Sequence, residues 1–106
     1  MTIVALVPDL MDQSRIRAAL ATSEGSVDVT FARDPARAAG AAVVVVDLAR
    51  FADRIAEIRA ATTGRIVAFG PHVDDDALAA ARSDGADVVV PRSQFFRDPA
   101  SLVTGA

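Results

Sequence analysis

The chain has 106 residues, of which 52% are hydrophobic and 24% charged, and its formal net charge is −3. These values fit one globular domain with a single core and argue against disorder. The mild negative charge without a basic block argues against nucleic-acid binding, and the lack of cysteine excludes disulfides and thiolate chemistry. No apolar stretch reaches the roughly 20 residues of a membrane span, and no basic, apolar leader opens the chain, so we expect a cytoplasmic protein.

Apolar runs of strand length alternate with helix-like segments along the whole chain. The predicted strands are residues 3–7, 27–31, 42–46, 66–69 and 88–90. The predicted helices are residues 10–21, a short turn between Asp34-Pro35 and Gly40, a segment around Phe51, Ile55 and Ile58, a segment from Asp74-Asp75-Asp76 to Gly85, and at most a short last helix near residues 99–103. Such alternation is typical of βα units around a parallel sheet.

The run from Ala41 to Asp47 is the most informative of these segments. Six apolar residues without period-two alternation precede the carboxylate of Asp47, which is typical of a strand buried on both faces. With right-handed crossovers, five such strands favour an α/β fold of the flavodoxin-like type. This is a three-layer sandwich with a five-stranded parallel sheet in the order 2-1-3-4-5, here with a last helix that is short or missing.

In that strand order, ligands bind at the carboxyl ends of the strands. The residues predicted to meet at this edge are Asp9 after the first strand, Asp47 after the third, Gly70 and His72 after the fourth, and Arg92 and Ser93 after the fifth. Two acids, an arginine, a histidine and a serine then share one pocket. Phe95 and Phe96 follow in a polar context, and we expect one of them in the core and the other on a contact surface.

Several of these polar residues also have a structural explanation. Asp9 and Asp47 are both placed to cap the helix that follows, and His72 suits a surface loop. The run Asp74-Asp75-Asp76 has the composition of a metal site, but a helix N-cap followed by two acids near the helix dipole explains it better. Glycine-rich nucleotide-binding motifs and the nucleophile elbow of hydrolases do not occur in the sequence, so we expect no enzyme.

Over roughly residues 2–98 the chain resembles a response-regulator receiver (CheY-like) domain of two-component systems. The resemblance is carried by Asp47 at the end of the third strand, Asp9 after the first, and Gly85-Ala86-Asp87 before the last. It implies that Asp47 matches the phospho-accepting aspartate, which attacks a phosphoryl donor while carboxylates hold Mg²⁺. In receivers, a hydroxyl after the fourth strand and a lysine after the fifth then engage the phosphoryl group.

The sequence departs from the receiver pattern at most of those other positions. After the first strand, Pro8-Asp9 leaves one carboxylate where receivers have two, and Gly70 stands where the hydroxyl belongs. Arg92-Ser93 replaces Lys-Pro, and all 11 basic residues of the chain are arginine. Arginine is not interchangeable with lysine, and Arg92 is predicted to form a bidentate pair with Asp47 that mimics a permanently engaged pocket.

These observations predict a stand-alone pseudo-receiver that signals through contacts with a protein partner or a second copy of itself. Arg92, Phe95 and Phe96 form its expected contact surface, and no cofactor is required. An alternative in another class is an active phospho-acceptor, modified on Asp47 by a histidine kinase or a small phosphodonor, with Mg²⁺ held by Asp9 and Asp47. A third is a sensor of small anions at the same edge, near Arg92, His72 and the helix start at Asp74.

Overall fold

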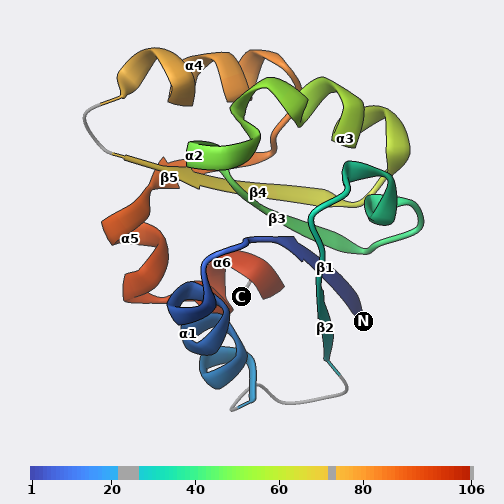
Figure 1. Cartoon of the computed structure of the whole chain (residues 1–106), viewed down its shortest axis with the longest axis vertical. Helices are drawn as coiled ribbons and strands as arrows, with labels where there is room; N and C mark the ends of the chain where they lie inside the picture. Colours follow the sequence, from blue (N-terminus) through green and yellow to red (C-terminus); the bar gives the residue numbers. More distant parts are fainter. Residues whose placement is uncertain (22–26, 72–73, 106) are drawn as a thin grey trace.

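The computed structural model describes residues 1–21, 27–71 and 74–105, and these form a parallel sheet between two helical layers (Figure 1). The five strands are β1 (Thr2–Leu6), β2 (Asp28–Phe31), β3 (Val43–Asp47), β4 (Arg65–Gly70) and β5 (Val88–Pro91). They lie in the order β2-β1-β3-β4-β5. The predicted fold class and strand order are therefore confirmed.

Helical segments follow every strand. They are α1 (Leu10–Ala21), η1 (Pro35–Ala38), α2 (Leu48–Phe51), η2 (Ala52–Arg54), α3 (Ile55–Ala61), α4 (Asp75–Ser83), α5 (Arg92–Arg97) and α6 (Pro99–Thr104), where η denotes a 3₁₀ helix. In Figure 1, α2, α3 and α4 lie on one side of the sheet, and α1, α5 and α6 lie on the other. Within the described residues, no helix is long and apolar enough to cross a membrane.

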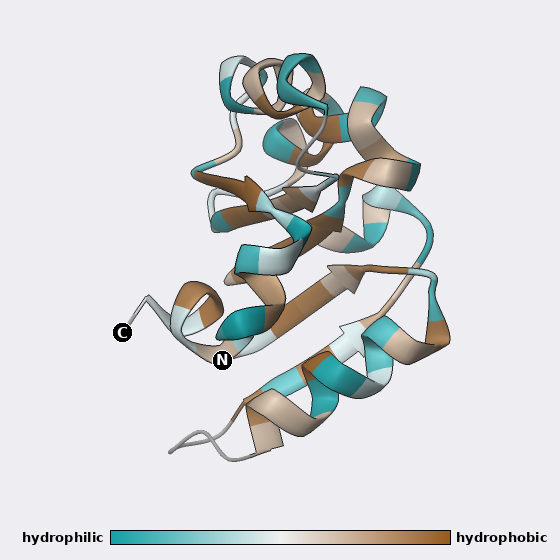
Figure 2. Ribbon diagram, turned by 90° about the vertical axis from the view of Figure 1, so that its left-hand side faces the viewer, coloured by the Kyte–Doolittle hydropathy of each residue, from teal (hydrophilic) through white to brown (hydrophobic). Residues whose placement is uncertain are grey.

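Two apolar clusters fill the space between the sheet and its helical layers, and Figure 2 shows the hydrophobic strands at the centre of the molecule. Strand β3 contributes to both, because all five of its residues are buried and successive side chains point to opposite faces. Val44 and Val46 pack in the cluster with residues of α2, α3 and α4, whereas Val43 and Val45 pack in the cluster with residues of α1, α5 and α6. This explains why the run lacks alternation.

Aspartates open several of the helical segments by accepting a backbone hydrogen bond. Asp34 accepts from the amide of Ala36, ahead of Pro35 at the first position of η1. Asp74 accepts from the amide of Ala77 at 3.1 Å, so the acidic run does begin a helix, as its N-cap pattern predicts. Both predictions from capping patterns are confirmed.

The C-terminal region differs from the prediction. At most one short helix near residues 99–103 was expected, but α5 starts directly after β5 and precedes α6. No side chain caps α5 at Pro91, so the usual local signal for a helix start is missing. Instead α5 is held by Phe95, which is completely buried and stacks on Phe69 of β4 with the ring centroids 4.6 Å apart.

Candidate functional site

The strand register determines which residues meet at the carboxyl edge of the sheet. Asp47 on β3 lies opposite Phe69 on β4, and Gly70 lies opposite Pro91 on β5, directly before Arg92. Alternation along β3 directs the side chain of Asp47 to the same face as Val45, which is the face covered by α1 and α5. Asp47 at the end of β3 and Arg92 directly after β5 therefore lie at the same edge of the sheet, with β4 between their strands.

Asp47 is a buried carboxylate that caps the next helix. Its side chain is almost inaccessible, and its Oδ1 accepts a hydrogen bond of 3.0 Å from the amide of Ala49 in α2. Burial raises the pKa of Asp47, and the negative charge of Asp12 raises it further, against the opposing effects of the Ala49 amide, Arg92 and Arg50. The capping role considered for Asp47 is thus present in the structure.

Asp9 also caps a helix. Its Oδ1 accepts a hydrogen bond of 3.0 Å from the amide of Asp12 in the first turn of α1, and Asp9 itself is exposed. The cap fixes the start of α1 and with it the position of Asp12.

Asp12 is the acidic residue at this edge that was not predicted. Its side chain is only 2% exposed, and both of its oxygens accept from Arg92. Arg92 Nη1 lies 2.7 Å from Asp12 Oδ2, and Nη2 donates to Oδ1, which makes a bidentate ion pair. The predicted pairing of Arg92 with Asp47 is therefore wrong in its partner, and the expected single carboxylate after β1 is joined by a second.

The sequence does contain a signal for Asp12. Asp12, Ile16 and Leu20 are spaced by four residues, so they lie on one face of α1, and all three are buried. A carboxylate in line with two core residues has to be buried as well, and a buried carboxylate needs a cationic or hydrogen-bonding partner. Since basic residues are scattered through the chain, the pattern alone did not identify that partner as Arg92.

Two aromatic rings lie close to the guanidinium of Arg92. Its Cζ lies 4.8 Å from the ring centroid of Phe96 and 5.8 Å from that of Phe69, distances at which cation–π attraction operates. The hydrogen bond to Asp12 raises the pKa of Arg92 despite partial burial, and the charges of Asp12, Asp47 and Asp9 add to this. The guanidinium is thus the cationic centre of an acidic edge.

The two adjacent phenylalanines have different environments. Phe95 is completely buried, so its assignment to a contact surface is wrong, because its ring is needed to anchor α5 on the sheet. Phe96 is half-buried and meets the rings of Phe69 and Phe95 edge to face, at 5.2 and 4.9 Å. Arg15 of α1 also lies over the Phe96 ring, at 5.6 Å. Phe96 therefore stays a candidate contact residue, together with Arg92.

The remaining predicted residues contribute less. Gly70 is packed tightly, because a Cβ at this position would lie 3.2 Å from the Leu48 Cβ and 3.4 Å from the Leu78 side chain. A serine or threonine there would have to displace these leucines. Ser93 is exposed in the first turn of α5. His72 lies outside the described residues.

Few carboxylate oxygens at this edge are free for a divalent cation such as the Mg²⁺ expected at Asp9 and Asp47. Hard cations such as Mg²⁺ need several free oxygen ligands. Both oxygens of Asp12 are taken by Arg92, and Asp9 and Asp47 each use one oxygen as a helix cap. Within the described residues, no group of three acidic, histidine or cysteine side chains is placed to hold a metal ion.

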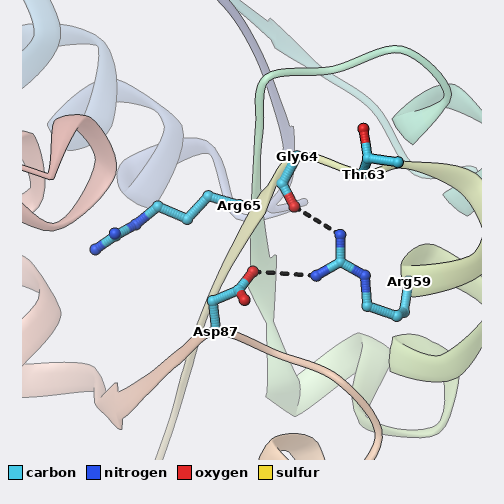
Figure 3. Close-up of a pocket in the computed structure, with 5 residues that line it drawn as sticks. All are labelled: Arg59, Thr63, Gly64, Arg65 and Asp87. Atoms are coloured by element: carbon cyan, nitrogen blue, oxygen red, sulfur yellow. Dashed lines mark hydrogen bonds and ion pairs between the residues drawn. The ribbon is translucent and has the colours of Figure 1, made fainter.

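A hollow lies at the opposite edge of the sheet, beside the amino ends of β4 and β5 (Figure 3). It has a volume of about 350 Å³ and is lined by Arg59, Thr63, Gly64, Arg65 and Asp87. Arg59 donates to the carbonyl of Gly64 at 2.7 Å and to Asp87 Oδ2 at 3.1 Å, while Asp87 also accepts from the amide of Ile66. Because Arg59 and Asp87 satisfy each other and the adjoining backbone, we assign them a structural role.

Comparison with known proteins gives a result for the fold. No protein-family model matches the chain, and no curated protein sequence does. Among solved structures, a response regulator receiver domain protein from Clostridium thermocellum has a TM-score of 0.79 and 16% sequence identity, with 98% of this chain and 91% of that one covered. The phosphorylated cyanobacterial phytochrome response regulator RcpA has a TM-score of 0.76 and 18% identity, with 91% of this chain and 86% of that one covered. The Mn²⁺-bound form of response regulator Rcp1 has a TM-score of 0.75 and 14% identity, with the same coverage of 91% and 86%.

The chain thus has the fold of response-regulator receiver domains. At identities of 14–18%, the likeness extends to the architecture and not to the chemistry of the site. What the site does has to be argued from its own residues.

Proposed function

We propose that this chain is a receiver-like signalling domain that works through contacts with another protein or a second copy of itself, without phosphorylation of Asp47. The observation that carries the proposal is the bidentate ion pair between Arg92 and the buried Asp12. Through this pair a positive charge of the protein itself lies beside the buried acid, in a pocket where phosphoryl acceptance would need a bound cation.

The chemistry of phosphoryl transfer supports this proposal. Transfer to a carboxylate gathers several negative charges in one place, and a metal ion normally offsets them. Here Asp12 is already neutralised by Arg92, and burial disfavours the charged form of Asp47 by raising its pKa. Gly70 supplies no hydroxyl to an incoming phosphoryl group. Its close packing against Leu48 leaves little room for a hydroxyl-bearing side chain at this position. The proposal accordingly assigns no enzymatic activity to the chain.

The proposed contact surface lies where the first turns of α1 and α5 meet. Arg92, which is 42% exposed, and the half-buried Phe96 present a cation and an aromatic edge, the combination that is enriched in protein interfaces. On α1, Leu10 and Met11 are 78% and 67% exposed, two positions and one position before the Asp12 that holds Arg92. Exposed apolar side chains next to an anchored arginine favour a protein partner.

A titration with Mg²⁺ and beryllofluoride, followed by NMR, tests the proposal. We expect the amide resonances of Asp47 and its neighbours to stay in place, as they should in Asp47→Asn, which keeps a helix-capping side chain. A saturable shift in the wild type that Asp47→Asn abolishes would instead establish the alternative function.

That alternative is an active phospho-acceptor, and one observation favours it. Asp9, Asp12 and Asp47 all follow or end strands at the carboxyl edge of the sheet, and the charge of each raises the pKa of Arg92, so three carboxylates share this edge. If Arg92 were displaced, two or more of them could serve a divalent ion. The titration above decides between the two functions, because only the alternative requires the metal and the phosphoryl mimic to act together.

A further inference from the structure

Two buried carboxylates face a single guanidinium at the carboxyl edge of the sheet. Asp12 on α1 and Asp47 on β3 are 2% and 6% exposed. Arg92 at the start of α5 pairs with Asp12, and its charge also lowers the pKa of Asp47. Arg92 gives its two terminal nitrogens to Asp12. Within the described part of the chain, the hydrogen bond that Asp47 accepts comes from the backbone amide of Ala49.

The position of Arg92 makes Asp47 its second acceptor. Asp47 lies opposite Phe69 in the sheet, and the guanidinium already lies 5.8 Å from the Phe69 ring. The elements that carry Asp47 and Arg92 are separated by β4, which is a spacing of roughly 10 Å between their backbones. An arginine has four rotatable side-chain bonds, so a rotamer change is the movement expected to turn the guanidinium from one carboxylate toward the other.

We propose that Arg92 is a two-position latch: Asp12 holds its guanidinium in the structure, and Asp47 takes it over when Asp12 no longer holds it. The transfer withdraws the cation from the ring of Phe96, which lies on the proposed contact surface. This rests on the proposed function only in one respect, namely that a partner touches the surface beside Arg92. The geometry of the latch does not depend on it.

The cost of burying an unpaired charge decides where the guanidinium of Arg92 lies, beside Asp12 or beside Asp47. A buried carboxylate without a partner is costly, so whichever acid loses Arg92 must gain a proton or another partner. Asp47 already tolerates this, because burial raises its pKa and the Ala49 amide satisfies one oxygen. A partner that contacts the exposed side of Arg92 and draws it away from Asp12 would therefore change the surface around Phe96, without a covalent step.

Asp12→Asn is the direct test, carried out in EDTA so that metal chemistry plays no part. The readouts are the side-chain Nε–Hε resonance of Arg92, identified by its loss in Arg92→Gln, and the ring-proton shifts of Phe96. We expect both to move in Asp12→Asn and to move again in Asp12→Asn/Asp47→Asn. Arg82, which donates to the backbone of Val89 at the outer strand β5, serves as an arginine whose resonance should not change. Asp98→Asn is the matched control substitution, since Asp98 caps α6 and does not contact Arg92.

A second measurement covers the case that Asp12→Asn does not fold. Asp47→Glu leaves Asp12 intact and extends the competing carboxylate by one methylene, so it should draw Arg92 away and shift the Phe96 ring protons. In equilibrium unfolding, Arg92→Gln should reduce the folded-to-unfolded ratio roughly tenfold in the Asp12→Asn background but only slightly once Asp47→Asn is added. The latch is refuted if Arg92 stays in place with Asp47→Glu, or if Asp47→Asn does not alter the Arg92 signal in the Asp12→Asn background. Either result leaves the beryllofluoride test of the proposed function unaffected.

Discussion

Asp12 and Arg92 are separated by 80 positions in the chain, yet they form a bidentate ion pair across the carboxyl edge of the sheet. The pair joins the first turn of α1 to the first residue of α5. It leaves the carboxylate almost inaccessible and the arginine side chain 42% exposed. This asymmetry in burial has direct consequences for mutants.

Removing either member of the ion pair should destabilise the protein, but by different amounts. Arg92→Gln leaves the carboxylate of Asp12 buried without a cation, which should cost about 3 kcal/mol. Asp12→Asn leaves a partly exposed arginine that can turn to water or to Asp47, so about 1 kcal/mol is expected. Urea unfolding of both variants measures the difference. Equal losses would contradict the burial seen in the structure.

The raised pKa of Asp47 predicts a pH-dependent effect of Asp47→Asn. Since the folded-state pKa lies above the ordinary value of 3.8, the folded protein binds a proton more readily than the unfolded chain. Asp47 therefore favours the folded state most at low pH and loses this contribution as the pH rises through its folded pKa. Asn at position 47 keeps a capping side chain. The free energy of unfolding of Asp47→Asn, relative to that of the wild type, should therefore increase from pH 3 to pH 7 by at least roughly a few tenths of a kcal/mol. A difference that is flat over this range, measured by urea unfolding, would show that the burial of Asp47 has no such effect.

Phe95 and Phe96 should respond very differently to truncation. Phe95→Ala removes a completely buried ring stacked on Phe69 and should cost about 3–5 kcal/mol. Phe96→Ala, the matched control, removes a half-buried ring and should cost less, about 1–2 kcal/mol. Thermal unfolding distinguishes the two. If Phe96 mediates self-association, light scattering of Phe96→Ser should also give a smaller mass than the wild type, whereas identical monomer masses would remove support for the dimer.

Gly85 and Gly40 provide a second matched pair at the opposite edge. Both have positive φ, at 118° and 76°, so alanine is strained at either position. At Gly85 the new Cβ would also lie 2.7 Å from Arg59 Cγ, whereas at Gly40 it would meet no atom within 4 Å. We expect Gly40→Ala to cost about 1 kcal/mol and Gly85→Ala at least about 2 kcal/mol, because Arg59 must also shift from Asp87. Equal costs in chemical unfolding would contradict the packing of Arg59.

The fold was predictable because its signals are local. The buried run ending at Asp47, the N-cap patterns at Asp34 and Asp74, and the alternation of strands with helices each depend on a few neighbouring residues. Together with the handedness of crossovers, they were sufficient for the strand order.

The details of the site were less predictable because they depend on tertiary contacts. Arg92 pairs with Asp12 and not with Asp47 because Asp12 lies on the inward face of α1. The position of α5 depends on the stacking of Phe95 on Phe69. Neither contact has a short-range pattern of its own. Only the four-residue spacing of Asp12, Ile16 and Leu20 hinted at a buried acid.

In the proposed function, the ion pair between Arg92 and Asp12 prevents phosphorylation of Asp47. Intact-mass spectrometry after incubation with acetyl phosphate and Mg²⁺ tests this most directly, with Asp47→Asn as the control. We predict that the mass of the wild-type protein stays unchanged. Addition of one phosphoryl group to the wild type, absent from Asp47→Asn, would contradict the account.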